Sequence, residues 1–329
     1  MKKVNILFCA VLAVVLILSC FAFTACDDGM FNGIDSQENA ATDESLAAFM
    51  KNIAPKMVLD GETGLYGVMK GNAYSVEYKN IVESNKRESM EIYTRKKNSA
   101  FNGKFNLTDD MTGKFDINLS YNRENIKGDK TTTNKGDIKM DTTVVDNKIY
   151  FDSSMDSSNA DETLNVKCKS VADTTYNVVC RIAAQIMRLI PIVRETVNLK
   201  DFGEKVKEVL RSNSLINSIK TDDETFITPK AYIKGSKMKI VIGNIGYMGM
   251  AFDDEWNLGA YDMVIDTRAN IGEKDPLTEG NINTGTELRL RKISPSSVSA
   301  PSDSGNYSNA EEDKNFNRIM NAVLTYMHS

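Results

Sequence analysis

Few side chains in this 329-residue sequence could carry out a reaction. The single histidine, His328, is next to the C-terminus, where chains fray, whereas Ser-His-Asp, Cys-His and zinc sites need an imidazole held inside a fold. Ser236 and Lys239 have the spacing of a serine–lysine nucleophile, which requires the serine at the start of a helix. Here Gly235-Ser236 is a predicted turn into a strand, where residues three apart point to opposite faces. We therefore expect no enzyme and no catalytic residues.

The acidic residues do not form a recognisable metal site. They cluster at predicted turns, in the runs Asp109-Asp110, Asp222-Asp223-Glu224 and Asp253-Asp254-Glu255. None has the alternating spacing that wraps a calcium ion, and acids at turns are usually solvated. Gly243, Gly246 and Gly249 lie within predicted strands, whereas a dinucleotide site has its glycines between a strand and a helix. The sequence predicts no metal and no cofactor.

Methionine is the side chain that stands out. The sequence has 16 methionines, many at inward-facing positions of predicted strands and helices, including Met69, Met90, Met140, Met187, Met238, Met248 and Met250. A flexible, polarizable side chain suits a cavity that accepts variable apolar ligands, but it is also ordinary core filler. The pattern leaves both interpretations open.

The N-terminus has the pattern of an export signal. Lys2 and Lys3 precede a stretch from Ile6 to Ala25 that carries no charge. Phe23-Thr24-Ala25-Cys26 resembles the lipobox of bacterial lipoproteins, although that family prefers Leu where this chain has Phe23. The resemblance implies that residues 1–25 are a cleaved signal peptide and that Cys26 carries a diacylglycerol, a palmitate-type anchor on the outer, extracytoplasmic face of the bacterial cell membrane. The alternatives are an ordinary cleaved signal and an uncleaved anchor.

Charge and cysteine content narrow the class further. The formal charge of −5 becomes −7 once Lys2 and Lys3 leave with the signal, and an acidic body argues against nucleic-acid binding. The densest basic group, Arg95-Lys96-Lys97, is interpreted as a solvated strand end. Beyond the export segment only Cys168 and Cys180 remain, and they are either bridged in the oxidising compartment or two buried thiols.

Hydrophobic periodicity predicts an α+β chain. Residues 26–43 are polar and glycine-containing, as in a flexible tether. A helix then begins near Thr42 or Asp43, with an apolar face of Leu46, Phe49, Met50, Ile53 and Met57. From about Gly64 to Phe151 the period is two, as in antiparallel strands with one buried face. That part includes a tight turn at Asp146-Asn147. Residues 152–162 are interpreted as a polar connection.

The second half of the domain repeats the order of helices followed by strands. An apolar helix over residues 176–190 has one face formed by Val179, Ile182, Ala183, Ile186, Met187 and Ile190. A second helix with Phe202, Val206, Val209 and Leu210 follows it. Period two then returns between Thr225 and Ile293, with a hairpin connection at residues 253–257. Residues 44–293 are therefore expected to be one α+β domain, whose strands form either one continuous sheet or two.

The C-terminal part is predicted to be a linker and a helix. Residues 294–309 are rich in serine and proline, and residues 310–329 form an amphipathic helix. Ser308 and Glu311 have the spacing of a capping box, and the apolar face is Phe316, Ile319, Met320, Val323, Tyr326 and Met327. We expect this helix to dock onto the body. Contact with a membrane or a partner is the alternative.

The order of an acylated N-terminus, a helix, alternating strands, apolar helices and more strands is similar to that of the LolA/LolB/LppX carriers of bacterial lipids and lipoproteins. The similarity covers roughly Glu44 to Ile293, and the added C-terminal helix departs from that group. It implies a large, curved, half-barrel-like antiparallel sheet covered by helices on its concave face. It also implies a non-enzymatic envelope lipoprotein that binds a lipid or other apolar small molecule between the sheet and helix 176–190. The alternative is a structural or interaction module with a solid core. Protein partners cannot be assigned.

Overall fold

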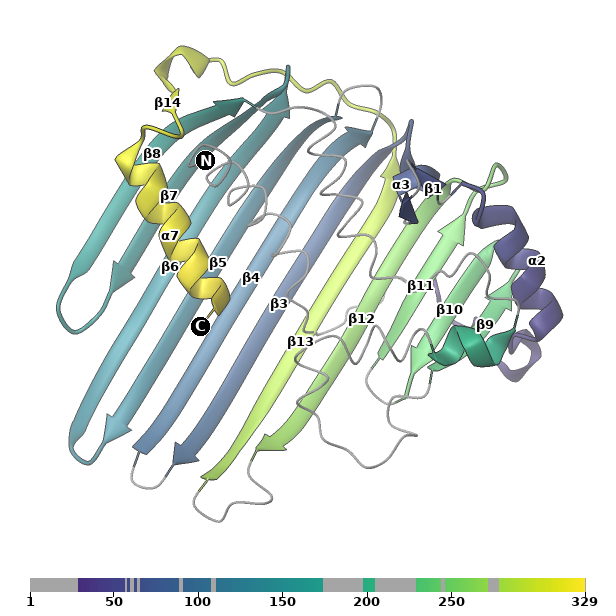
Figure 1. Ribbon diagram of the computed structural model, residues 1–329, viewed down its shortest axis with the longest axis horizontal. Coiled ribbons are helices and arrows are strands. Elements are labelled where there is room, and N and C mark those ends of the chain that lie inside the picture. Colours follow the sequence, from purple (N-terminus) through teal and green to yellow (C-terminus); the bar gives the residue numbers. More distant parts are fainter. Residues whose placement is uncertain are drawn as a thin grey trace.

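The computed structural model describes residues 29–56, 58–59, 62–63, 66–88, 91–107, 111–173, 198–204, 229–243, 246–271 and 278–328. These residues are mostly β structure, with few helices, so the described part of the chain is more β-rich than the α+β prediction implies (Figure 1). The main feature of the described residues is one open sheet of 12 strands, of which eleven are antiparallel to their neighbours and the short twelfth, β14 (Ser308–Asn309), is added in parallel at one edge.

The sheet consists of two meanders that meet in its middle. One contains β3 (Ala73–Glu88), β4 (Glu91–Leu107), β5 (Met111–Lys127), β6 (Lys130–Val145), β7 (Lys148–Ser158) and β8 (Thr163–Asp173). The other contains β9 (Pro229–Lys234), β10 (Lys237–Ile242), β11 (Gly246–Phe252), β12 (Leu258–Ile271) and β13 (Thr278–Ile293). β3 pairs antiparallel with β13 along its whole length, so the two strand-rich parts form one sheet. A separate pair, β1 (Val58–Leu59) and β2 (Glu62–Thr63), lies near the short helix α3 (Tyr66–Met69).

Alternation along each strand gives the sheet two different faces. In β5 the odd-numbered positions from Gly113 to Leu119 are buried and the even-numbered positions between them are exposed. Strand register aligns these buried positions with those of the neighbouring strands. We call this side the helix face, because α2 and α7 pack on it, and the opposite side the outer face.

The predicted turn at Asp146-Asn147 is confirmed, and the predicted polar connection over residues 152–162 is corrected. Asp146 and Asn147 both have positive φ, at 52° and 57°, as a two-residue hairpin of type I′ requires. Residues 152–162 are not simply a polar connection. β7 continues to Ser158, because Ser153 and Met155 keep the alternation and are buried on the helix face.

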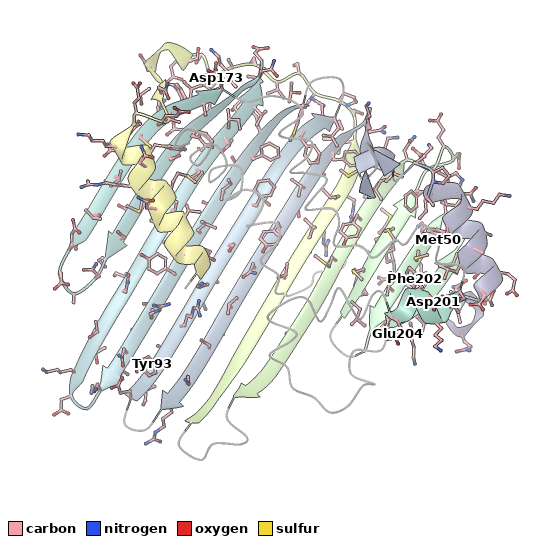
Figure 2. The ribbon with its side chains drawn as sticks, in the orientation of Figure 1. Met50, Tyr93, Asp173, Asp201, Phe202 and Glu204 are labelled. Atoms are coloured by element: carbon pink, nitrogen blue, oxygen red, sulfur yellow. The ribbon has the colours of Figure 1, made fainter. Side chains whose placement is uncertain are left out.

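Helix α2 (Asp43–Ile53) matches its prediction. Thr42 caps it, since the Thr42 hydroxyl accepts a hydrogen bond from the backbone N–H of Ser45 at 3.2 Å. Its buried residues are Leu46, Phe49, Met50 and Ile53; Met57 is outside the described residues. Phe202, which is predicted on the helix after residues 176–190, is also buried. It lies close to α2, where the backbone N–H of Leu199 donates to Asp43 (Figure 2).

Residues 29–41 are packed against the sheet, so the flexible tether expected over 26–43 does not describe them. Phe31 and Ile34 are buried on the outer face, and the Phe31 ring lies over Gly249, whose added Cβ would be 2.8 Å from it. Lys239 Nζ donates to the Phe31 carbonyl at 3.3 Å and pairs with Asp35 at 3.1 Å. The chain then passes the edge strand β9, where the N–H of Ala41 donates to the Ala231 carbonyl, and enters α2 on the helix face.

The C-terminal part folds back onto the opposite end of the sheet. After η4 (Ser304–Asn306), β14 (Ser308–Asn309) pairs in parallel with Ser170 and Val171 of β8. Helix α7 (Lys314–His328) begins later than predicted, and its cap is Asp313, which accepts from the N–H groups of Asn315 and Phe316. The capping box of Ser308 and Glu311 was therefore a wrong prediction: Ser308 is a strand residue that donates to Asp313.

Candidate functional site

The helix face carries a continuous row of side chains across ten strands. Strand register places ten residues side by side, in the order Ile240, Met248, Met263, Leu288, Tyr78, Phe101, Ile117, Met140, Ser153 and Cys168. The first nine are at most 8% exposed. A second row parallel to it contains Met238, Met250, Tyr261, Leu290, Val76, Phe115 and Phe151. Nearly all of these residues belong to the hydrophobic core of the described part of the chain, and we treat the two rows as the candidate site.

The rows divide into two parts with different side chains. The aromatic half, on β3 to β7, contains the rings of Tyr74, Tyr78, Phe101, Phe105, Phe115 and Phe151. Phe101 and Phe115 stack at 5.3 Å between ring centres, and Phe105 and Phe115 lie 6.0 Å apart. Because Gly103 has no side chain, the Phe115 ring occupies the space over it, where a Cβ would be only 2.3 Å from the ring.

Helix α7 lies over β5 to β8 and so covers part of the aromatic half (Figure 1). Phe316 packs on Phe151 at 4.9 Å between ring centres, and the Tyr326 hydroxyl lies 2.6 Å from Ser99 Oγ. Five of the six residues predicted for the apolar face of this helix are buried, namely Phe316, Ile319, Met320, Val323 and Tyr326. The expected docking of the C-terminal helix is therefore seen in the structure, and the protein fills this half with its own rings.

The methionine half lies on β10 to β12. Met238 is directly opposite Met250, and Met248 is directly opposite Met263. All four are at most 5% exposed. Helix α2 adds Met50 and Phe49, whose ring contacts Phe252 and Trp256 at 5.7 and 5.5 Å between centres (Figure 2). The predicted inward-facing Met69, Met140, Met238, Met248 and Met250 are all buried, while Met90 and Met187 lie outside the described residues.

The strand ends beyond the aromatic half are basic, and the prediction of a solvated end was wrong for two of three residues. Lys96 is exposed and pairs with Glu83 on the outer face. Lys97 is only 8% exposed, and its Nζ donates to the Tyr326 carbonyl at 2.6 Å. Arg95 is half-buried and directly opposite Arg123 of β5. The signal that was missed is strand alternation. Residues 95 and 97 are odd-numbered, as are Phe101 and Phe105, so all four side chains lie on the same face of β4.

Cys168 is the one cysteine among the described residues. Cys168 is a free, half-buried cysteine on the helix face, and burial raises the pKa of its thiol to about 11. Cys180, its predicted partner in a bridge, lies outside the described residues. A thiol with a raised pKa is a poor nucleophile at neutral pH, so Cys168 is not a reactive centre.

Other predicted chemical groups are accounted for by packing. Ser236 Oγ donates to the Phe252 carbonyl at 2.8 Å, whereas Lys239 points to the outer face with Asp35. Asp253 accepts from the N–H groups of Glu255 and Asn257 inside the predicted hairpin connection. Within the described ranges, no group of three or more His, Cys, Asp or Glu side chains could hold a metal ion. Asp109-Asp110 and Asp222-Asp223-Glu224 lie outside those ranges.

The predicted lipidation and ligand residues cannot be placed. Cys26 and the face of helix 176–190, namely Val179, Ile182, Ala183, Ile186, Met187 and Ile190, lie outside the described residues. In the described part of the chain, no helix is both long and apolar enough to cross a bilayer.

Comparison with known proteins places the chain in no family. No protein-family model matches the chain, and no curated protein does. The solved structure of m157 from mouse cytomegalovirus aligns with 69% of this chain and 92% of its own at 5% identity, with a TM-score of 0.10. A likeness at that level carries no argument about fold or function.

Proposed function

We propose that this protein is a non-enzymatic lipoprotein of the bacterial cell envelope that binds a lipid or another apolar ligand on the helix face. The observation that carries the proposal is the row of buried, mostly apolar side chains across ten strands, which extends well beyond the described helices α2 and α7 (Figure 1). Ligand affinity for such a surface follows the apolar area that it removes from water.

The methionine half and the middle strands are the proposed seat of the ligand. In the aromatic half the rings pack on one another and, at Phe151, on α7, whereas methionine side chains can rearrange around different apolar shapes. The proposed lid is the predicted helix 176–190, which belongs to the stretch between Asp173 and Asn198. Asp173 ends β8 near one edge of the sheet, and Asp201, three residues after Asn198, lies close to α2 near the other edge (Figure 2).

The proposed anchor at Cys26 would hold the protein close to the membrane. Four residues, Asp27 to Met30, separate it from Phe31, which is buried against the sheet, so the acylated residue can lie no more than ~18 Å along the chain from the body. Phe31 and Ile34 fix that segment to the outer face of β10 to β12. The outer face near these strands is therefore the side proposed to lie next to the lipid surface, with the helix face on the other side.

Two experiments test these parts separately. Metabolic labelling with palmitate should be lost in Cys26→Ala and kept in Cys20→Ala; labelling that survives in Cys26→Ala overturns the anchor. For ligand binding, a neutral fluorescent probe, cis-parinaric acid methyl ester, should bind the purified full chain saturably. Met248→Trp, which fills the methionine half, should weaken that binding, whereas Lys96→Gln on the outer face should not.

A structural or interaction module with a solid core is the second candidate. It is favoured by the ring contacts that fill the space beneath α7. Absence of saturable probe binding in the folded chain would select this candidate over the carrier.

A further inference from the structure

Strand register collects cations that lie far apart in the sequence into one row on the outer face. The row crosses eight strands from β9 to β5, and five of its eight positions carry a positive charge. We call these five residues the basic row: Lys234, Lys237, Arg291, Lys104 and Lys114. The positions between them, on β11, β12 and β3, are two alanines and a serine, so this part of the row contains no acid.

The lysines of the basic row are available to a partner. Lys104, Lys114 and Lys234 are exposed and form no ion pair within the described part of the chain. Lys237 is half-buried, and its Nζ donates to the Met30 carbonyl at 3.5 Å.

Two pairs of like charges are directly opposed in this row. Lys104 faces Lys114 across β4 and β5, and Lys234 faces Lys237 across β9 and β10. Such pairs have Cβ atoms about 5 Å apart and destabilise a sheet. An external anionic surface would relieve this repulsion.

Acidic residues lie on only one side of the basic row. The neighbouring outer-face row, toward the middle of the strands, contains Glu77, Asp116 and Asp262, of which Asp262 pairs with Arg291. On the other side, toward the strand ends, the outer-face residues of β13 to β5 are uncharged: Ile293, Ala73, Asn106 and Thr112. An anionic surface that approaches from the strand ends therefore meets the cations before the acids.

The proposed anchor lies beside the basic row. Cys26 is four residues before Met30, whose carbonyl is bound by Lys237, so it lies within ~14 Å of that carbonyl along the chain. From Lys234 to Lys114 the row crosses seven strand spacings, or ~34 Å (Figure 1). A bilayer that holds the anchor is therefore next to one end of a long line of cations.

We propose that the basic row is a membrane-contact surface that binds the anionic headgroups of bilayer phospholipids, with the nearby strand ends tilted toward the bilayer. This inference rests on the proposed anchor and adds the class of lipid and the residues that contact it. Each lysine held near an anionic surface strengthens binding roughly fivefold. Because the attraction decays over about 10 Å at 0.1 M salt, only cations at the contact contribute.

Lysine footprinting of the full chain tests the proposed contact. The wild-type chain is extracted from membranes and placed in nanodiscs of phosphatidylcholine, either alone or mixed with phosphatidylglycerol. Sulfo-NHS-acetate then acetylates accessible lysines, and peptide mass spectrometry measures the extent at each site. Lys130 and Lys135 are exposed controls on β6. Lys135 is eight residues along β6 from Thr143, which faces Lys114, and so lies ~26 Å from the row.

We expect acetylation of Lys104, Lys114 and Lys234 to fall at least threefold when phosphatidylglycerol is present, and to recover at about 1 M salt, where the screening length is about 3 Å. Lys130 and Lys135 should react equally in both discs. The double variant Lys104→Gln/Lys114→Gln should weaken the contact roughly 25-fold and so remove the protection of Lys234. The charge-matched variant Lys130→Gln/Lys135→Gln should keep that protection.

The outcomes separate the inference from the proposed function. If the chain stays on both kinds of disc but the basic row reacts equally in both, the headgroup contact is wrong and the anchor stands. If polyaspartate added to phosphatidylcholine discs protects the row as well as phosphatidylglycerol does, the row is a surface for an acidic protein instead. A chain retained on neither kind of disc removes the anchor, and the proposed function fails with it.

Discussion

The aromatic and methionine halves of the helix face share one strand pattern but are filled differently. In the aromatic half, rigid rings contact each other and α7 closes over them, as in Phe151 against Phe316. In the methionine half, four flexible side chains from β10 to β12 lie in two cross-strand pairs. The difference shows that one continuous sheet can pack rigid rings in a fixed arrangement at one end and flexible methionine side chains, which can rearrange, at the other.

The largest effect is expected where a ring of the aromatic half is removed. Phe316→Ala should lower the free energy of unfolding by about 3–5 kcal/mol, since Phe316 is fully buried against Phe151. Chemical denaturation measures the loss. Arg318→Ala, on the exposed side of α7, is the control and should change stability by less than about 0.5 kcal/mol. A loss below 1 kcal/mol in Phe316→Ala would mean that α7 is not part of the core.

A smaller effect is expected at the cap of α7. Asp313→Ala removes the acceptor of the Asn315 and Phe316 N–H groups and should cost about 0.5–2 kcal/mol. Burial raises the pKa of Asp313, but hydrogen bonds from Ser308, Phe316, Ser170 and Asn315 outweigh it and lower the pKa overall. A lowered pKa stabilises the fold above the ordinary value near 3.8, and this contribution is lost as the pH falls through the folded pKa.

The pH dependence of unfolding checks this prediction. The stability difference between wild type and Asp313→Ala should be constant from pH 7 to about 5 and should shrink below about pH 4. A difference that grows on acidification would contradict the assigned hydrogen bonds.

The methionine half should tolerate a substitution that the aromatic half would not. Met250→Leu conserves volume and should cost less than about 1.5 kcal/mol. Because leucine is less flexible, we also expect the variant to bind a narrower set of acyl chain lengths. A titration series of neutral esters of different lengths measures this range. An unchanged range would show that methionine flexibility does not govern ligand choice.

The smallest effect concerns Cys168 of β8, which reports on burial at the edge of the helix face next to the aromatic half. Burial raises its pKa to about 11, so little thiolate is present at pH 8. Alkylation of Cys168 by iodoacetamide, followed by peptide mass spectrometry, should be slow at pH 8 and rise about tenfold per pH unit up to pH 10. A rate at pH 8 equal to that of an unfolded peptide would contradict the burial.

Local patterns predicted much of the fold, while long-range placement escaped them. Period two located most strands, Asp146-Asn147 gave the hairpin turn, and Thr42 gave the start of α2. The pairing of β3 with β13 joins segments about 200 residues apart, for which the sequence contains no local signal. The packing of Phe31 on Gly249 was missed for the same reason, because a polar, glycine-containing segment resembles a tether until its one large ring is placed.

The candidate site was only half visible in the sequence. The predicted inward-facing methionines that lie in the described residues are buried, because alternation reports which face a residue occupies. Arg95 and Lys97 were interpreted from composition as part of a basic run. Both are odd-numbered residues of β4, as Phe101 is, and strand alternation therefore places them on the helix face. The opposition of Arg95 and Arg123 depends on the register of β4 and β5, which periodicity does not specify.

The most direct test of the central proposal is native mass spectrometry of the full chain extracted from membranes. We predict a single acyl-lipid adduct on the chain in addition to any mass fixed covalently at Cys26, and we expect Met248→Trp to lose that adduct while Lys96→Gln keeps it. A folded wild-type chain that carries no non-covalent lipid mass would contradict the account.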